Sequence, residues 1–153
     1  MAEITAENAG SQKFIPLVRE LLSAYHAFSL FDATGHRLSG SGLTVAQARV
    51  IFTLGNTDGM TCSDIGERTH ITKGTLTGVV DRLEHKGLID RWAVIGDGRK
   101  TIVALTRKGE RVFEKEYPRQ VSYLKQRFDR LGANDRDEAV RLLKKFQEIF
   151  ETA

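Results

Sequence analysis

The spacing of apolar residues predicts a mostly helical protein. Between Phe14 and Phe28, apolar side chains recur at every third or fourth position, which is typical of a helix with one buried stripe. This pattern stops near Thr34, where a polar, glycine-rich stretch continues to Gly42. Two further long helical patterns occupy the end of the chain, and Pro118 is expected to kink the first of them or to weaken one of its hydrogen bonds.

Residues 43–105 carry the signals of three shorter helices. Thr44 and Gln47 fit a capping box, in which a threonine and a glutamine three residues later satisfy the free amides of a helix start. A second capping pattern opens a helix over 61–69, and Thr72 caps a third helix that runs to about Lys86 and is closed by Gly87. The middle of the chain is therefore expected to hold short helices in close succession.

A β-hairpin is expected directly after the third helix. Two β-prone runs cover 89–95 and 101–105, and an Asp-Gly pair between them favours a tight turn. The segment between the runs also holds Arg99 and Lys100, so the predicted hairpin has a basic tip. Two short helices followed by such a hairpin describe a winged helix-turn-helix.

The helix over 72–86 has one face suited to close approach. Its apolar residues share one side, and the opposite side carries Gly74 and Gly78. Two interior glycines destabilise a helix by about 1 kcal/mol each relative to alanine, so a reason for them is needed. Entry into a DNA major groove is one such reason. The alternative, which this helix alone leaves open, is a polar face that meets only water.

Composition excludes several classes of protein. The length of 153 residues, with 41% apolar and 28% charged residues, suits one soluble domain. Cys62 is the only cysteine, so an intrachain disulfide is excluded. No apolar run reaches the roughly 18 residues of a membrane span, and the first residues do not resemble a signal peptide, so we expect a cytoplasmic protein without membrane contact. The sequence shows no pattern of catalytic, cofactor-binding or metal-ligating residues, so we expect no enzyme, cofactor or metal.

The charge count permits nucleic-acid binding without requiring it. Lysine and arginine number 23 against 20 acidic residues, which gives a net charge of +3. Residues 61–100 hold seven cationic and six acidic side chains, a net of only +1. Attraction for DNA must therefore come from the positions of individual cations, above all Lys73, Arg82, Arg99 and Lys100.

Two segments resemble the MarR family of multiple-antibiotic-resistance-type transcriptional regulators. Residues 72–91, TKGTLTGVVDRLEHKGLIDR, are similar to that family's recognition helix and the turn after it. Residues 97–109, DGRKTIVALTRKG, are similar to its wing and next helix start, and residues 43–47 resemble the entry to its second helix. The resemblance in helix order extends over 12–152. Gly66 departs from the pattern, because the family usually has alanine there, and we interpret this as a local packing difference.

The resemblance implies a mostly α fold with a small β-hairpin wing. It divides the chain into a frayed N-terminus (1–11), an N-terminal dimerisation helix and loop (12–42), a winged helix-turn-helix DNA-binding lobe (43–105) and C-terminal dimerisation helices (106–153). It also implies a homodimer that binds a palindromic operator in double-stranded DNA. The DNA contacts expected by position are Thr72, Lys73, Gly74, Thr75, Thr77, Arg82, Asp97, Arg99 and Lys100. Within this set, Asp97 is expected to pair with the guanidinium of Arg99 and orient it into the minor groove.

The end helices independently favour a dimer. They carry more apolar residues than so small a lobe should need to cover, and pairing across a two-fold axis would bury them. The alternative is packing of the first and last helices within one chain. The residues concerned are Phe14, Leu17, Leu21, Phe146, Ile149 and Phe150.

The resemblance further implies repression that is relieved by a small ligand or by oxidation. Aromatic acids and phenolic compounds are common effectors in the family. A pocket for them would lie between the first helices, the kinked helix and the winged lobe, and the polar residues expected there are Tyr25, His26, Ser29 and Arg37. The simpler alternative is that each of these four residues is an ordinary surface or core residue.

Two other functions stay open at this point. Cys62 lies at the first turn of the helix over 61–69, so a thiol-based redox-sensing repressor is one alternative. For this cysteine, a small half-buried helix residue is the simpler interpretation. The other alternative is a winged-helix protein-interaction module without DNA binding, against which the basic wing tip argues.

Overall fold

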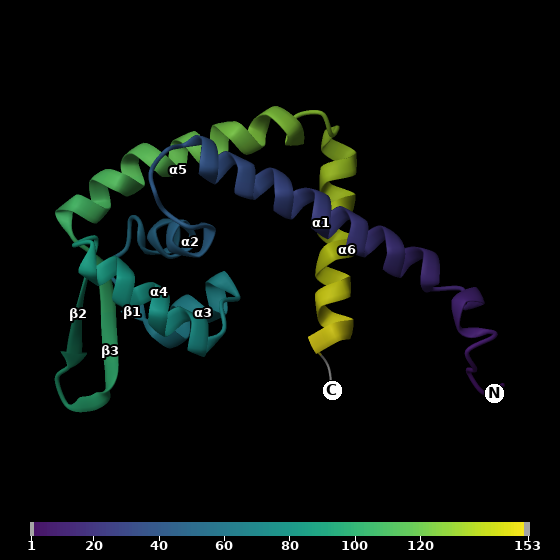
Figure 1. The fold of residues 1–153 in the computed structure, drawn as a ribbon, viewed down its shortest axis with the longest axis horizontal. Helices are drawn as coiled ribbons and strands as arrows, with labels where there is room; N and C mark the ends of the chain where they lie inside the picture. The colour runs from purple at the N-terminus through teal and green to yellow at the C-terminus, as the bar shows by residue number, and fades with distance from the viewer. Residues whose placement is uncertain (1, 152–153) are drawn as a thin grey trace.

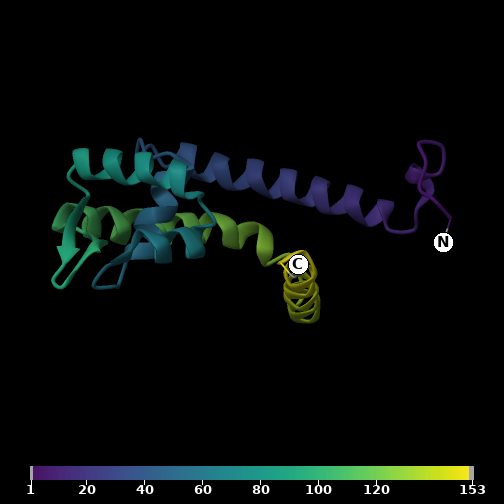
Figure 2. The same cartoon turned by 90° about the horizontal axis from the view of Figure 1, so that it is seen from below.

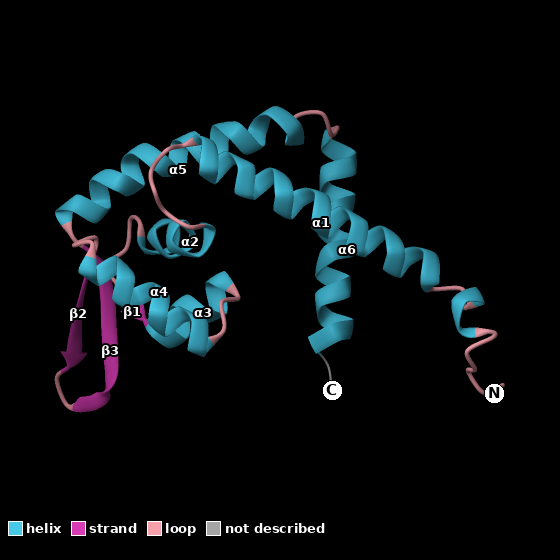
Figure 3. Cartoon of the chain, viewed as in Figure 1, coloured by secondary structure: helices cyan, strands magenta, loops and turns pink. Residues whose placement is uncertain are grey.

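The computed structural model describes residues 2–151 and confirms a mostly helical fold with a small β wing (Figures 1 and 3). Its helices are α1 (Ile15–Leu38), α2 (Val45–Leu54), α3 (Cys62–Thr69), α4 (Lys73–His85), α5 (Arg107–Phe128) and α6 (Ala133–Glu151), after a short 3-10 turn at Ala9–Ser11. The strands are β1 (Met60–Thr61), β2 (Ile89–Val94) and β3 (Asp97–Leu105). Within residues 2–151, no helix is long and apolar enough to cross a membrane.

The helix starts follow the capping signals in the sequence. At α2 the capping box is complete, because the Gln47 amide donates to Thr44 Oγ1 (3.1 Å) and the Thr44 amide donates to Gln47 Oε1 (3.2 Å). At α3 the Asp64 amide donates to Thr61 Oγ1 (3.1 Å). The cap expected at Thr72 is different: its hydroxyl donates to Thr75 Oγ1 (3.2 Å), and no side-chain cap bond forms there.

The first helix is longer than its sequence pattern predicts. The polar stretch indicates an end near Thr34, but α1 continues to Leu38. The Thr34 hydroxyl donates to the Leu30 carbonyl (2.8 Å), so this polar side chain is satisfied inside the helix. A Cβ on Gly35 would lie 2.4 Å from Tyr123 Cδ1, so this glycine lets α5 approach α1 and does not end the helix.

The three strands form one antiparallel sheet in the order β1-β3-β2. Val94 pairs with Asp97, so the hairpin turn lies at residues 95–96, where Gly96 has a φ of +89°. The sequence places the turn over residues 96–100, which is wrong. Arg99 and Lys100 therefore lie on β3, next to the turn and not in it.

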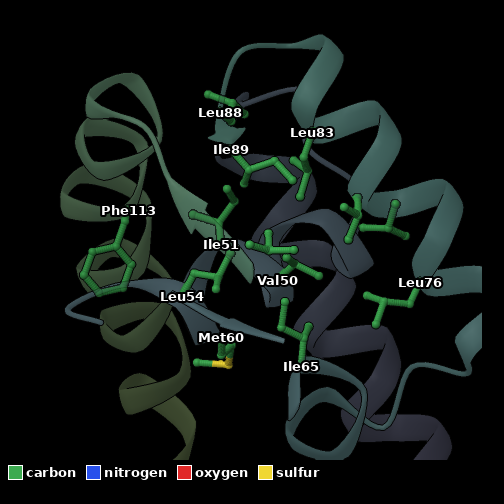
Figure 4. Packing of buried hydrophobic residues seen from close by; sticks show 13 residues of the cluster. Val50, Ile51, Leu54, Met60, Ile65, Leu76, Leu83, Leu88, Ile89 and Phe113 are labelled. Atoms are coloured by element: carbon green, nitrogen blue, oxygen red, sulfur yellow. The ribbon is translucent and has the colours of Figure 1, made fainter. Parts of the chain in front are cut away.

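The buried core joins α2, α3, α4 and the sheet, with Phe113 of α5 closing one side (Figure 4). The apolar face of α4 is confirmed: Leu76, Val79, Val80 and Leu83 are all buried. Removing these side chains from water holds α4 in place and fixes which of its faces points outward.

The N-terminal part of α1 and the whole of α6 project away from this core (Figure 2). The two helices cross in Figure 1 but are separated in Figure 2. α6 has no buried residue among those described, and α1 has only three. Ile149 and Phe150 are 58% and 68% exposed. Packing within one chain therefore leaves the apolar faces of these helices largely uncovered. α5 continues unbroken through Pro118.

Candidate nucleic-acid interface

A helix-turn-helix is formed by α3, a tight link and α4. His70 ends α3 in the left-handed region with φ +58°, which turns the chain sharply. The buried Thr69 hydroxyl donates to the Ile65 carbonyl (2.7 Å) and accepts from the Ile71 amide (3.3 Å). These bonds fix the direction in which α4 leaves the turn.

The outer face of α4 is small, polar and open. Cβ atoms placed on Gly74 or Gly78 would meet nothing within 4 Å, so packing inside the chain does not require either glycine. The Thr77 hydroxyl donates to the Lys73 carbonyl (3.0 Å). The expected contact residues on this helix are all exposed; they are Thr72, Lys73, Gly74, Thr75, Thr77 and Arg82. The structure therefore brings this part of the expected set onto one accessible side.

The wing presents Arg99 and Lys100 as exposed side chains of β3. Asp97 acts differently from the expectation. Its Oδ1 accepts a hydrogen bond from the backbone amide of Arg99 (3.1 Å), and residues 2–151 show no ion pair between its carboxylate and the Arg99 guanidinium. The amide lies two residues further along β3, within reach of the short Asp97 side chain. Asp97 therefore shapes the backbone next to the turn and leaves the guanidinium free.

Arg91 on β2 ties the wing to α4. Its guanidinium donates to both carboxylate oxygens of Glu84 (2.9 and 3.0 Å) and lies 2.9 Å from Asp81 Oδ1. Bonding to this guanidinium lowers the pKa of Glu84. One cation thus offsets part of the negative charge of two acidic groups on α4. Lys73, Arg82, Arg99 and Lys100 enter no ion pair within residues 2–151.

The residues expected at a ligand pocket do not meet in the single chain. Tyr25 is 71% exposed, His26 is exposed and Ser29 is half-buried. Arg37 lines a cavity of about 490 Å³ beside the α1–α2 loop, whose lining includes none of the other three. Tyr25 and Arg37 are about 18 Å apart along the helix axis at 1.5 Å per residue.

A buried polar cluster between α1, α2 and α5 was not foreseen from the sequence. Asp32 accepts from Gln120 Nε2 (3.0 Å) and from Arg49 (3.3 Å), and His36 Nε2 lies 3.7 Å from the same carboxylate. Burial lowers the pKa of His36, against the raising effect of Asp32. The spacing of Asp32 and His36, four residues apart on one helix, is the signal that could have revealed part of it.

Cys62 is half-buried at the first turn of α3. It lines a cavity of about 450 Å³ together with Lys73 and Thr77 of α4. Within residues 2–151, no group of three or more His, Cys, Asp or Glu side chains is placed to hold a metal ion.

Known proteins share this arrangement of helices and wing. Residues 41–100 match the sequence profile of the MarR family. A stretch of 73 residues is 33% identical to the homoprotocatechuate degradative operon repressor of Escherichia coli, covering 48% of this chain and 49% of that repressor. The chain thus spans about half the length of the curated relative it matches. Over this winged helix-turn-helix segment, the chain is similar to MarR-family regulators.

Solved MarR-type structures extend the likeness to nearly the whole chain. Sco3205, a MarR family transcriptional regulator from Streptomyces coelicolor in complex with DNA, aligns with a TM-score of 0.82 at 19% identity, covering 100% of this chain and 93% of that one. BpsR of Bordetella bronchiseptica, whose DNA binding is regulated by 6-hydroxynicotinic acid, aligns with a TM-score of 0.72 at 26% identity. The alignment covers 86% of this chain and 98% of BpsR. The matched relatives are transcriptional regulators.

Gly66 is the departure from the MarR pattern, and the structure gives it a simple account. A Cβ at this position would lie 3.5 Å from the Ile71 carbonyl oxygen and 3.8 Å from Leu76 Cδ2, which are ordinary contacts. The alanine usual in the family would therefore fit without movement of α3 or α4, and the local difference leaves the helix-turn-helix geometry unchanged.

Proposed function

We propose that this chain is a dimeric, sequence-specific DNA-binding transcriptional regulator of the MarR type. The observation that carries the proposal is the outer face of α4, where bare glycine backbone lies beside exposed threonines. Lys73 and Arg82 lie on the same helix and enter no ion pair within residues 2–151. Such a face can enter the major groove without steric hindrance, and its hydroxyls can bond base edges or phosphates. Arg99 and Lys100 extend the contact into an adjacent minor groove, whose negative potential attracts arginine.

Dimerisation is part of the proposal. Residues 12–42 and 106–153 are assigned to the subunit interface, because α1 and α6 leave large apolar side chains exposed in the single chain. A two-fold dimer would bury these faces and place two α4 helices about 34–36 Å apart, which matches successive major grooves of a palindromic operator.

The regulatory mode proposed is repression in the cytoplasm that a small aromatic or phenolic ligand relieves. The names of two similar proteins support this: one is a repressor of a homoprotocatechuate degradative operon, and DNA binding by the other is regulated by 6-hydroxynicotinic acid. Both names refer to small aromatic acids. No catalytic step is assigned to the chain.

Gly74→Leu tests the role of α4. A Cβ at this position would meet nothing within 4 Å, so we expect the free energy of unfolding to rise by about 0.8 kcal/mol from helix propensity. The same side chain would block close approach to DNA, and we expect at least about tenfold weaker binding to a duplex selected from random sequences. Fluorescence anisotropy and urea denaturation measure the two effects.

The matched control is Gly10→Leu, where a Cβ also meets nothing within 4 Å but the position lies outside the lobe. It should leave DNA affinity unchanged. Equal affinity of Gly74→Leu and the unmodified protein would show that α4 does not enter the groove. Failure of the selection to enrich any sequence would remove the proposal of specific DNA binding altogether.

A dimer is expected in sedimentation equilibrium at micromolar protein. The double variant Ile149→Asp and Phe150→Asp should shift it to a monomer, because two charges would enter an apolar interface, while the exposed positions leave the fold of the single chain intact. Lys144→Glu on the same helix is the control for added negative charge. A monomeric unmodified protein would remove the argument for a palindromic site.

A further inference from the structure

Two helices connect the DNA-facing lobe to the rest of the chain. α1 leads into the lobe, and α5 runs out of it to α6 (Figure 1). The first turns of α5 pack on the lobe, because Phe113 closes its core, whereas the far end of the helix reaches Phe128. The direction of α4 relative to the outer parts of α1 and α5 therefore depends on how firmly these helices are held where the lobe begins.

α5 has a weak point at this place. Pro118 lies inside the helix, and proline has no amide to donate to the carbonyl four residues earlier, that of Glu114. A helix that lacks one of its hydrogen bonds bends more easily at that position. This position lies between Phe113, which packs in the lobe, and the outer end of α5. A fixed angle between the two parts of the helix therefore needs support from side chains.

The carboxylate of Asp32 supplies such support from α1. Its Oδ1 accepts from Gln120 Nε2 (3.0 Å), two residues beyond the proline, and the same nitrogen donates to the Asp32 backbone carbonyl (3.3 Å). Its Oδ2 accepts from Arg49 Nη2 of α2 (3.3 Å). Each carboxylate oxygen is thus bonded to a different helix, and one side chain ties α1, α2 and α5 together.

The bond between Arg49 and Asp32 has no counterpart nearby. Within residues 2–151, it is the only hydrogen bond that joins α2 to α1 or α5. Phe52 of α2 also packs on His36 and Tyr117, with ring centroids 5.8 and 5.1 Å apart. Apolar contacts of this kind have little directional preference, whereas a hydrogen bond fixes both distance and direction. The orientation of α2 against the two long helices therefore depends strongly on Asp32.

Burial of the Asp32 carboxylate has a cost in free energy. Asp32 is only 7% exposed, and a buried carboxylate loses the water that solvates its charge. Apolar side chains that replace a buried ion pair often stabilise a protein, so stability alone does not account for this residue. A fixed geometry does account for it, since a lobe that turned about the proline would carry α4 away from its place on DNA.

We propose that Asp32 is a positioning residue that holds the hinge at Pro118 in one orientation and thereby sets the distance between the two α4 helices of the dimer. The protein then selects operators by the number of base pairs between their half-sites. The hinge is a property of one chain, whereas its effect on operator spacing rests on the proposed function.

The spacing test compares a duplex selected from random sequences with two duplexes that have one base pair inserted or removed at the centre. The change shifts one half-site by about 3.4 Å and turns it by about a tenth of a helical turn. The unmodified protein should bind both altered duplexes at least about tenfold more weakly, and Asp32→Leu should bind all three within about threefold. An unchanged preference in Asp32→Leu would overturn the proposal, as would the absence of a preference in the unmodified protein.

Three further variants separate positioning from stability. Asp32→Asn keeps an acceptor for Gln120 but loses the charge that faces Arg49, so its preference should be intermediate, and it replaces Asp32→Leu if that variant does not fold. Ile65→Val trims a buried side chain inside the lobe and should lower stability without changing the preference. Pro118→Ala restores the missing helical bond at an exposed position, so Asp32→Leu should have less effect in that background. An equal effect with and without the proline would overturn the hinge.

A distance within one chain tests the hinge without DNA. Spin labels are placed at Glu67→Cys on α3 and Gln126→Cys near the end of α5, both exposed positions, in a Cys62→Ser background. Pulsed EPR on labelled protein diluted with excess unlabelled protein then reports the intrachain distance. We expect a wider distance distribution in Asp32→Leu than with Asp32 present, and equal widths would overturn the proposal. If the protein binds no DNA, the proposed function fails, while the widths still decide the hinge.

Discussion

Replacing Gly109 with alanine is expected to destabilise the protein by about 3 kcal/mol, although glycine is a poor helix residue. Gly109 lies in the first turn of α5, and a Cβ there would fall 2.1 Å from the carbonyl oxygen of Leu88. That oxygen accepts a hydrogen bond from the Thr106 amide (3.1 Å). Displacing the Leu88 carbonyl would therefore break this bond, which holds the chain between β3 and α5 in place. Thr106 also donates from its hydroxyl to the Gly87 carbonyl (2.7 Å).

Gly66→Ala provides the matched control, because it is the same substitution inside another helix of the lobe. Its Cβ would make only ordinary contacts, so helix propensity should stabilise the protein by up to about 1 kcal/mol. Urea denaturation measures whether the free energy of unfolding falls in Gly109→Ala and rises in Gly66→Ala. Both variants are compared at one protein concentration, because the stability of a dimer depends on concentration. Stabilisation of both would show that the backbone at Leu88 adjusts without loss.

Local signals in the sequence predict those parts of the fold that local interactions determine. The apolar face of α4 follows from its 3.6-residue period, and the Thr44–Gln47 box follows from side chains that reach their own helix start. The end of α1 could not be found this way. Gly35 stays helical because it packs against Tyr123, a partner 88 positions away in the sequence.

The same limit applies to the wing and to the polar groups behind it. Strand β1 has only two residues and exists through pairing with residues 102–103 of β3, so it has no pattern of its own. The hairpin turn falls at Gly96 because a residue with positive φ is needed between Val94 and Asp97. The Asp-Gly pair at 97–98 wrongly predicts a turn further along the chain, because such pairs are typical of hairpin turns. The Asp32, His36 and Gln120 cluster forms only when α1 and α5 meet.

Arg99→Ala is expected to weaken DNA binding by about ten- to hundredfold and to lower the slope of log affinity against log salt by about one unit. Arg99 is exposed next to the wing turn and free of ion pairs within residues 2–151, so its whole charge is available to the minor groove. Fluorescence anisotropy at several salt concentrations measures both quantities. Arg136→Ala, on α6, removes one arginine outside the lobe and should change neither.

Substitutions at Asp97 then separate its two possible roles. Asp97→Asn keeps an oxygen that accepts from the Arg99 amide, so the wing backbone and most of the DNA affinity should survive. Asp97→Ala removes this acceptor and should weaken binding, with less effect than loss of Arg99 itself. If Asp97→Asn lowers affinity as much as Asp97→Ala, the carboxylate charge is needed. In that case Asp97 would orient the guanidinium when DNA is bound, because a salt bridge to Arg99 requires the charge of the carboxylate.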